Sequence, residues 1–146
     1  MISLIEISQE NWNKCCSLSV TEDQKGYIAS NAYSLAESKY EPGRYPLGID
    51  KDGELVGFIM YGYDEEENTS WIIRFMIDKA YQNKGLGKEA LKKLIDMLFD
   101  KNKKTDIKLC VEPDNKVAIK FYESFGFLPT GDKWGTELIY ILQRED

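Results

Sequence analysis

The sequence predicts a mixed α/β fold: one domain over residues 1–146, built on a central sheet of six to seven mostly antiparallel strands with helices on both faces. Three observations predict this fold. A chain of 146 residues fits a single domain. Strand-type and helix-type runs follow in the order strand, two helices, three strands, helix, strand, helix, two strands. The run 71–77 is almost entirely apolar, which is typical of a central strand buried on both faces.

The N-terminal elements follow from local patterns. A strand is expected over residues 2–7 and a helix from Gln9 onward. A second helix is expected over 21–38, because Thr21 and Gln24 resemble a capping box and apolar residues recur behind them at helical spacing.

The later elements are bounded by turn signals. The Asp52-Gly53 pair is typical of a hairpin turn, and Gly126 is typical of the residue that closes a helix. The remaining expected elements are a loop over 40–46, strands over 47–50 and 54–63, a helix over 87–99, a strand over 107–111, a helix over 115–125 and a hairpin of 127–134 with 138–142.

Composition limits the chemistry and the location. The chain has no histidine and three cysteines, so His-dependent nucleophilic machinery is excluded and no metal site is expected. No apolar run approaches the roughly 20 residues that span a bilayer, and the start of the sequence lacks the pattern of a signal peptide. Unpaired thiols fit a reducing compartment, so we expect a cytoplasmic protein that does not contact membranes.

The charge is unevenly distributed along the chain. Residues 79–120 carry 11 Lys against 6 acids, or +5, and the rest carries 8 Lys plus Arg against 19 acids, or −11, which together give the net charge of −6. This division suggests two ligands of opposite sign, an anionic cofactor and a cationic acceptor. The net charge and the pI of about 4.8 disfavour a nucleic-acid partner.

A glycine-rich turn between the strand 71–77 and the helix from Gly87 carries the strongest signal. Backbone N–H groups and the positive end of the helix dipole meet there, an arrangement that binds phosphate groups. A Walker A loop does not fit, because Glu89 follows Lys88 where Ser or Thr is required. A dinucleotide fingerprint matches the glycine spacing, but its ribose-binding carboxylate would have to be Asp106, which begins a strand instead of ending one.

The turn fits a third pattern, Q/R-x-x-G-x-G/A, which is that of acyl-CoA enzymes. A second block, N-x-x-A-x-x-F-Y-x-x-x-G-F, spans residues 115–127. With both blocks in this order, residues 70–127 resemble the core of the GNAT superfamily of acetyl-CoA-dependent N-acetyltransferases. Residues 31–40 are similar to its polyamine-acetylating branch. The resemblance implies the GNAT fold, in which the strand before the turn and the strand after the helix are parallel neighbours that splay apart.

The resemblance also implies roles for individual residues, with acetyl-CoA as cosubstrate. Tyr122 is the candidate general acid for the departing thiolate, although a tyrosine packed in the core beside Phe121 and Phe125 is the alternative. Asn115 is expected at the cofactor arm, at its helix cap, or at both. The residues expected to contact the cofactor are Phe75, Met76, Ile77, Gln82, Asn83, Lys84, Gly85, Leu86, Gly87, Lys88, Asn115, Ala118 and Tyr122.

The acceptor side is less defined. Glu37, Tyr40 and Glu41 lie where the expected second helix meets its loop, and we expect them to contact the ammonium groups of the acceptor. No carboxylate stands on the strand 71–77, so the general base stays open. Arg74 on that strand needs a carboxylate partner, and its role stays open too.

These observations together predict an N-acetyltransferase that acetylates a small polyamine such as spermidine or spermine by direct attack of the amine. Two alternatives remain open: acetylation of another amine (a protein or peptide, an amino acid or an aminoglycoside), and a non-catalytic CoA-binding sensor. The sequence leaves a homodimer open.

Overall fold

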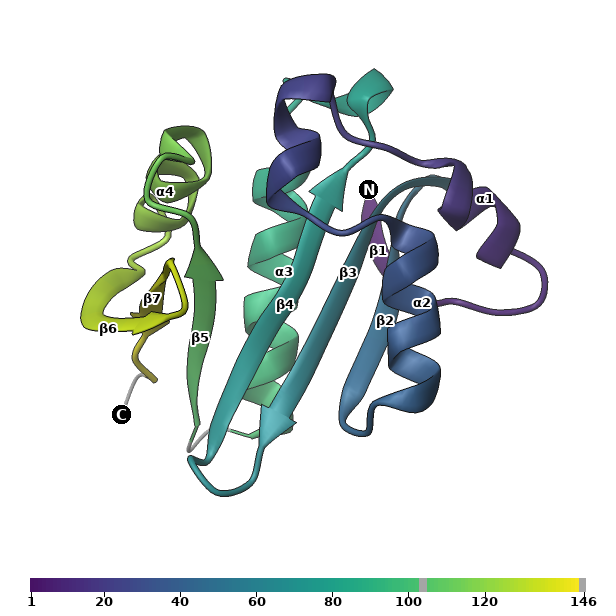
Figure 1. The fold of residues 1–146 in the computed structure, drawn as a ribbon. Helices are drawn as coiled ribbons and strands as arrows, with labels where there is room; N and C mark the ends of the chain where they lie inside the picture. Colours follow the sequence, from purple (N-terminus) through teal and green to yellow (C-terminus); the bar gives the residue numbers. More distant parts are fainter. Residues whose placement is uncertain (103–104, 145–146) are drawn as a thin grey trace.

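The computed structural model describes residues 1–102 and 105–144, which form one seven-stranded sheet in the order β1-β2-β3-β4-β5-β7-β6 (Figure 1). All neighbouring strands are antiparallel except β4 and β5, which are parallel. The expected mixed, mostly antiparallel sheet is therefore confirmed. The strands are β1 (Ile2–Glu6), β2 (Arg44–Lys51), β3 (Glu54–Asp64), β4 (Thr69–Ile77), β5 (Asp106–Val111), β6 (Leu128–Trp134) and β7 (Glu137–Leu142).

Helices cover both faces of this sheet. Figure 1 shows α3 behind the sheet and α1 and α2 in front of it. Within the described residues, every helix is too short or too polar to cross a membrane. The helical elements are α1 (Trp12–Ser17), the 3₁₀ turn η1 (Glu22–Tyr27), α2 (Asn31–Tyr40), the 3₁₀ turn η2 (Lys79–Tyr81), α3 (Leu86–Lys101) and α4 (Lys116–Glu123).

Two apolar cores hold these layers together, one on each face. Val56 and Ile59 of β3 belong to the larger core, in which α3 packs Leu91 and Leu94 against the sheet. The smaller core on the opposite face contains Phe58 and Met60 of β3 together with Cys15 of α1. Because β3 is apolar at almost every position, it contributes to both cores, which fits its interior position between β2 and β4.

The expected helix over 21–38 is wrong as a single element. The chain forms η1, becomes extended at Ile28, and begins α2 at Asn31. Thr21 does not cap a helix; its hydroxyl bonds the Asp23 carboxylate instead. Ser30 is the true N-cap, and its Oγ accepts a hydrogen bond from the Tyr33 N–H at 3.1 Å. The apolar spacing continued through the break, so periodicity alone could not locate it.

The strand β2 is longer than expected and contains Pro46. Because β1 pairs with β2 only as far as Leu47, Pro46 lies where β2 has no neighbour on that side. A missing N–H is tolerated at such an edge. The expected Asp52-Gly53 turn is confirmed: the φ angles are 51° and 93°, and Lys51 pairs with Glu54 across the turn.

The strand β4 loses one of its two neighbours, β5, halfway along its length. Its ladder with β5 runs only from Thr69 to Ile72, although β4 continues to Ile77. Ile73 is skipped in the ladder with β3, because Tyr61 pairs with Ile72 and Met60 with Arg74. This β-bulge bends the strand where it leaves β5. The expected burial of both faces is therefore wrong in part: Ile72 and Met76 are buried, but Phe75 is only half-buried because it faces the resulting opening.

Candidate active site

A cleft of about 1600 Å³ opens where β4 and β5 diverge. Its walls come from the end of β4, the turn before α3, the start of α4 and the β6–β7 hairpin. Figure 1 shows β5, α4, β6 and β7 grouped on one side of this opening and the rest of the molecule on the other. The early end of the parallel ladder therefore creates the cleft, and residues from both halves of the sheet meet in it.

The glycine-rich turn has the geometry of an anion site. Asn83 and Gly85 both have left-handed backbone conformations, with φ of 63° and 78°, and Gly85 is the N-cap of α3. Such a turn at the start of a 16-residue helix directs successive N–H groups toward one point. The Gln82 side-chain amide fixes the turn, because it donates to the Ile77 carbonyl and to Gln24 Oε1 at 2.9 Å each.

The structure brings together twelve of the thirteen residues expected at the cofactor. Phe75, Met76, Ile77, Gln82, Asn83, Gly85, Leu86, Gly87, Lys88, Asn115, Ala118 and Tyr122 all line the cleft. Lys84 does not, because its ammonium lies over the Tyr81 ring, 5.7 Å from the centroid. Asn115 caps α4, and its Oδ1 accepts a hydrogen bond from the Ala118 N–H at 3.4 Å.

Tyr122 combines the two positions considered for it. Its ring packs against Phe121 and Phe127, with centroids 5.3 and 5.8 Å away, and it also lines the cleft. Burial raises the pKa of the phenol far above its ordinary value, so the hydroxyl keeps its proton throughout the neutral range. Tyr122 is thus a neutral hydrogen-bond donor at the cleft wall.

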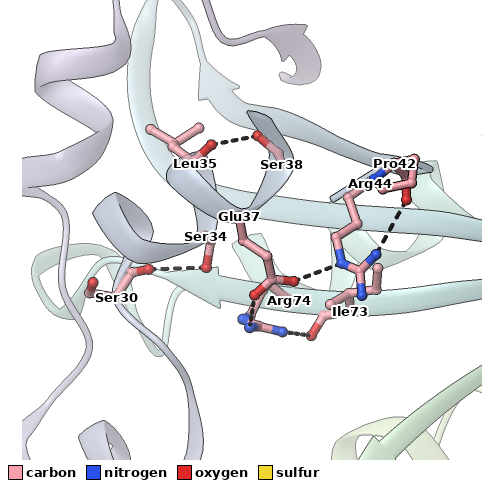
Figure 2. Close-up of polar contacts among 9 residues, drawn as sticks. All are labelled: Ser30, Ser34, Leu35, Glu37, Ser38, Pro42, Arg44, Ile73 and Arg74. Atoms are coloured by element: carbon pink, nitrogen blue, oxygen red, sulfur yellow. Dashed lines mark hydrogen bonds and ion pairs between the residues drawn. The ribbon is translucent and has the colours of Figure 1, made fainter. Parts of the chain in front are cut away.

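The partner that Arg74 needs is Glu37. Figure 2 shows the Glu37 carboxylate on α2 between Arg44 of β2 and Arg74 of β4, at N–O distances of 2.7 and 3.2 Å. Arg74 also donates to the Ile73 carbonyl at 3.1 Å, which ties the guanidinium to the bulge. One negative charge shared by two guanidinium groups leaves this cluster with a net charge of +1. Arg74 Nε is buried and lacks a hydrogen-bond partner within the described part of the chain.

The three expected acceptor residues do not come together. Glu37 lines the cleft, but both of its oxygens are bonded to arginines. Tyr40 is 86% exposed, and neither it nor Glu41 is among the residues that line the cleft.

Sequence reasoning missed Glu112 and Glu137 in the cleft wall. The lining includes ten Asp or Glu side chains against five Lys or Arg. Glu112 follows β5 and Glu137 begins β7, so they are 25 positions apart in the sequence but adjacent in the sheet, one step beyond the Val111–Leu138 pair. An acid directly after one strand and another at the start of a second were the only signals available. Among the described residues, these carboxylates and their neighbours form no group suited to a metal ion.

A mixed sheet that opens between two parallel strands, with a glycine-rich helix start and a tyrosine in the opening, defines the N-acetyltransferase fold that the two sequence blocks predicted. The family described as the Acetyltransferase (GNAT) family matches residues 4–127. The chain belongs to this family, and both the predicted resemblance and the predicted enzyme class are confirmed.

Relatives and solved structures agree with this assignment. The chain is 37% identical over 137 residues to the spermine/spermidine N(1)-acetyltransferase of Bacillus subtilis (strain 168), covering 90% of each chain. It is 38% identical, with the same coverage, to the probable spermine N(1)-acetyltransferase of Bacillus subtilis subsp. natto. The fold matches the spermidine N-acetyltransferase of Vibrio cholerae in complex with CoA and spermine at a TM-score of 0.74, with 15% identity, covering 96% of this chain and 92% of that one.

Proposed function

We propose that this protein uses acetyl-CoA to acetylate a primary amine of a small polyamine, such as spermidine or spermine, by direct attack of the amine on the thioester. One observation carries the proposal: the glycine-rich turn, the diverging end of β4 and Tyr122 all open into the same cleft. The names of the two Bacillus relatives support the polyamine as acceptor.

The residues present fit acetyl-CoA, which supplies the acetyl thioester when it is bound. N–H groups from Asn83 to Lys88 would hold the diphosphate, with the helix dipole of α3 behind them. Lys88 and Lys116 also line the cleft and add positive charge to it. Backbone groups of Phe75 to Ile77 would hold the amide-bearing arm, because β5 provides no ladder partner beyond Ile72.

The Glu37–Arg44–Arg74 cluster and Tyr122 would influence the protonation of the amine and of the departing thiolate. A primary amine has a pKa near that of lysine, about 10.4, and must lose its proton before it attacks. Partial burial in the cleft and the net positive charge of the Glu37–Arg44–Arg74 cluster both lower the pKa of an amine held near that cluster. The neutral Tyr122 hydroxyl would donate a hydrogen bond to the sulfur as the thiolate departs.

Cysteine chemistry in the cleft favours direct transfer over an acyl-enzyme route. Cys110 lines the cleft, but burial, together with the Glu137 charge, raises the pKa of its thiol to about 11. A thiol that stays protonated at neutral pH is a poor nucleophile. The three free cysteines also support a cytoplasmic location.

Purified protein, acetyl-CoA and a thiol reagent test the proposal against a panel of amines. Spermidine and spermine are expected to release CoA at saturable rates, with acetyl-polyamine identified by mass spectrometry. A peptide with a free N-terminus, an amino acid and an aminoglycoside serve as the alternative acceptors. Turnover of any of these but not of a polyamine would overturn the polyamine assignment. Tight binding of acetyl-CoA without turnover of any amine would favour the sensor.

A further inference from the structure

The β6–β7 hairpin presents an acidic and aromatic wall to the cleft. Side chains alternate between the two faces of a strand, so Glu137 and Ile139 share the face that lines the cleft. Trp134 is paired with Glu137 across the hairpin and lines the cleft as well. Trp134 is 73% exposed, so a large apolar surface lies open beside a carboxylate.

Glu112, which follows β5, lies beside Glu137 and completes this acidic wall. The carboxylates of Glu112 and Glu137 differ in how they are held. The Thr136 hydroxyl bonds both oxygens of Glu112, at 2.9 and 3.2 Å, and so fixes its orientation. The Glu137 carboxylate has neither a hydrogen bond nor an ion pair within the described part of the chain. Two like charges that lie side by side repel one another, and a cation placed between them relieves this repulsion.

The groups that face Glu137 define its electrostatic environment. Burial and the Glu112 charge raise the pKa of the Glu137 carboxyl, and the Arg74 charge on the opposite wall opposes them. Arg74 is itself bonded to Glu37, so it is not free to neutralise Glu137 directly. The acidic wall is therefore short of positive charge, and the Glu37–Arg44–Arg74 cluster has an excess of it.

The acidic wall and the positively charged cluster would favour different protonation states at the two ends of a polyamine. An ammonium between two carboxylates is stabilised in its charged form, which is the opposite of what a reacting amine requires. The acidic wall therefore suits an ammonium that keeps its proton. An indole next to it suits the methylene chain and attracts the cation through its ring face.

We propose, on the basis of the function proposed above, that Glu112, Glu137 and Trp134 form a subsite that holds the non-reacting ammonium of a polyamine acceptor. Glu137 is the residue that determines specificity, and Thr136 positions Glu112. The open cleft and the name of the Bacillus subtilis relative also support a polycationic occupant. A monoamine has no second ammonium to place in this subsite.

Kinetics of Glu137→Gln with two acceptors test the subsite. With spermidine at saturating acetyl-CoA, kcat/KM is expected to fall about tenfold or more, mainly through KM. With n-butylamine, kcat/KM is expected to stay within about twofold of the wild type. Glu10→Gln removes the same charge at an exposed position outside the cleft and is expected to change neither value. An equal loss for both amines, or no loss for spermidine, would overturn the proposal.

Calorimetric titration of spermidine into the protein without acetyl-CoA gives a readout that does not depend on turnover. Spermidine is expected to bind the wild type, Glu10→Gln and Glu137→Asp more tightly than Glu137→Gln or Glu112→Gln. If n-butylamine turnover is too slow to measure, this comparison decides, and equal affinities would end the proposal. Spermidine binding without acetylation would leave the subsite standing and refute the proposed function instead. Melting temperatures show whether each variant is folded.

Discussion

Glu37 on α2 binds Arg74 on β4 through an Oε1–Nη2 contact of 3.2 Å, although the two residues are 37 positions apart in the chain. The same carboxylate binds Arg44 of β2 (Figure 2). One side chain thus links a helix to two strands beside the bulge at Ile73, where the cleft begins.

Replacing Glu37 with Gln is expected to destabilise the protein by about 2–4 kcal/mol, because two partly buried guanidinium groups lose their counter-charge. Thermal unfolding followed by circular dichroism measures the change, with a fall in Tm of about 5 °C or more. Glu22→Gln breaks the exposed pair with Lys25 and is expected to leave Tm nearly unchanged, because solvent screens this pair. Similar losses for the two variants would show that Glu37 does not link the elements.

Replacing Tyr122 with Phe is expected to lower kcat about 100-fold, because the hydroxyl is the proposed donor to the leaving sulfur. The KM for acetyl-CoA is expected to stay within about twofold, since the ring contacts with Phe121 and Phe127 are kept. Steady-state kinetics with spermidine measures both values. An unchanged kcat would leave Tyr122 as a packing residue only.

Gly87→Ala is expected to weaken the binding of acetyl-CoA without lowering the stability of the protein. A Cβ at this position meets its nearest atom, Phe121 Cζ, at 3.6 Å, which is ordinary contact. Alanine favours a helix over glycine by up to about 1 kcal/mol, so the variant is expected to be at least as stable as the wild type. The added methyl group would lie between Ile77 and Phe121, which both line the cleft, so affinity for acetyl-CoA is expected to fall. Calorimetry measures the expected fall in affinity for acetyl-CoA, and thermal unfolding measures the expected unchanged or higher stability. Unchanged affinity would count against the proposed cofactor path.

The buried Cys15 thiol is expected to make the protein less stable at alkaline pH. Burial raises the pKa of Cys15 from 9.0 to about 12, and the charge of the neighbouring Cys16 thiolate contributes to this increase. The unfolded chain releases this proton more readily than the folded chain. The contribution of the protonated Cys15 thiol to the free energy of unfolding is therefore complete below pH 9 and is lost as the pH rises toward 12. Between these values the wild type is expected to lose up to about 1.4 kcal/mol more per pH unit than Cys15→Ala. Urea unfolding over this range measures the difference, and equal slopes would contradict it.

Local features of the sequence predicted most of the fold and the residues of the glycine-rich turn and of α4 that line the cleft. The glycines at 85 and 87 and the helix that begins after Asn115 depend on neighbours in the chain, so their patterns could be read directly. The break between η1 and α2 could not, because Ile28 and Leu35 pack into the same core and keep helical spacing. The Glu112–Glu137 pair could not either, because only the β5–β7 register brings the two together.

The short parallel ladder of β4 and β5 also has a thermodynamic consequence. Within residues 1–102 and 105–144, no strand pairs with β4 beyond Ile72 on the β5 side, so backbone amides there depend on solvent or on a bound molecule for hydrogen bonds. A ligand whose own amides fill that gap would act as a removable strand and raise the melting temperature as its concentration increases. Resistance to unfolding would then report how much of the coenzyme the cell has available.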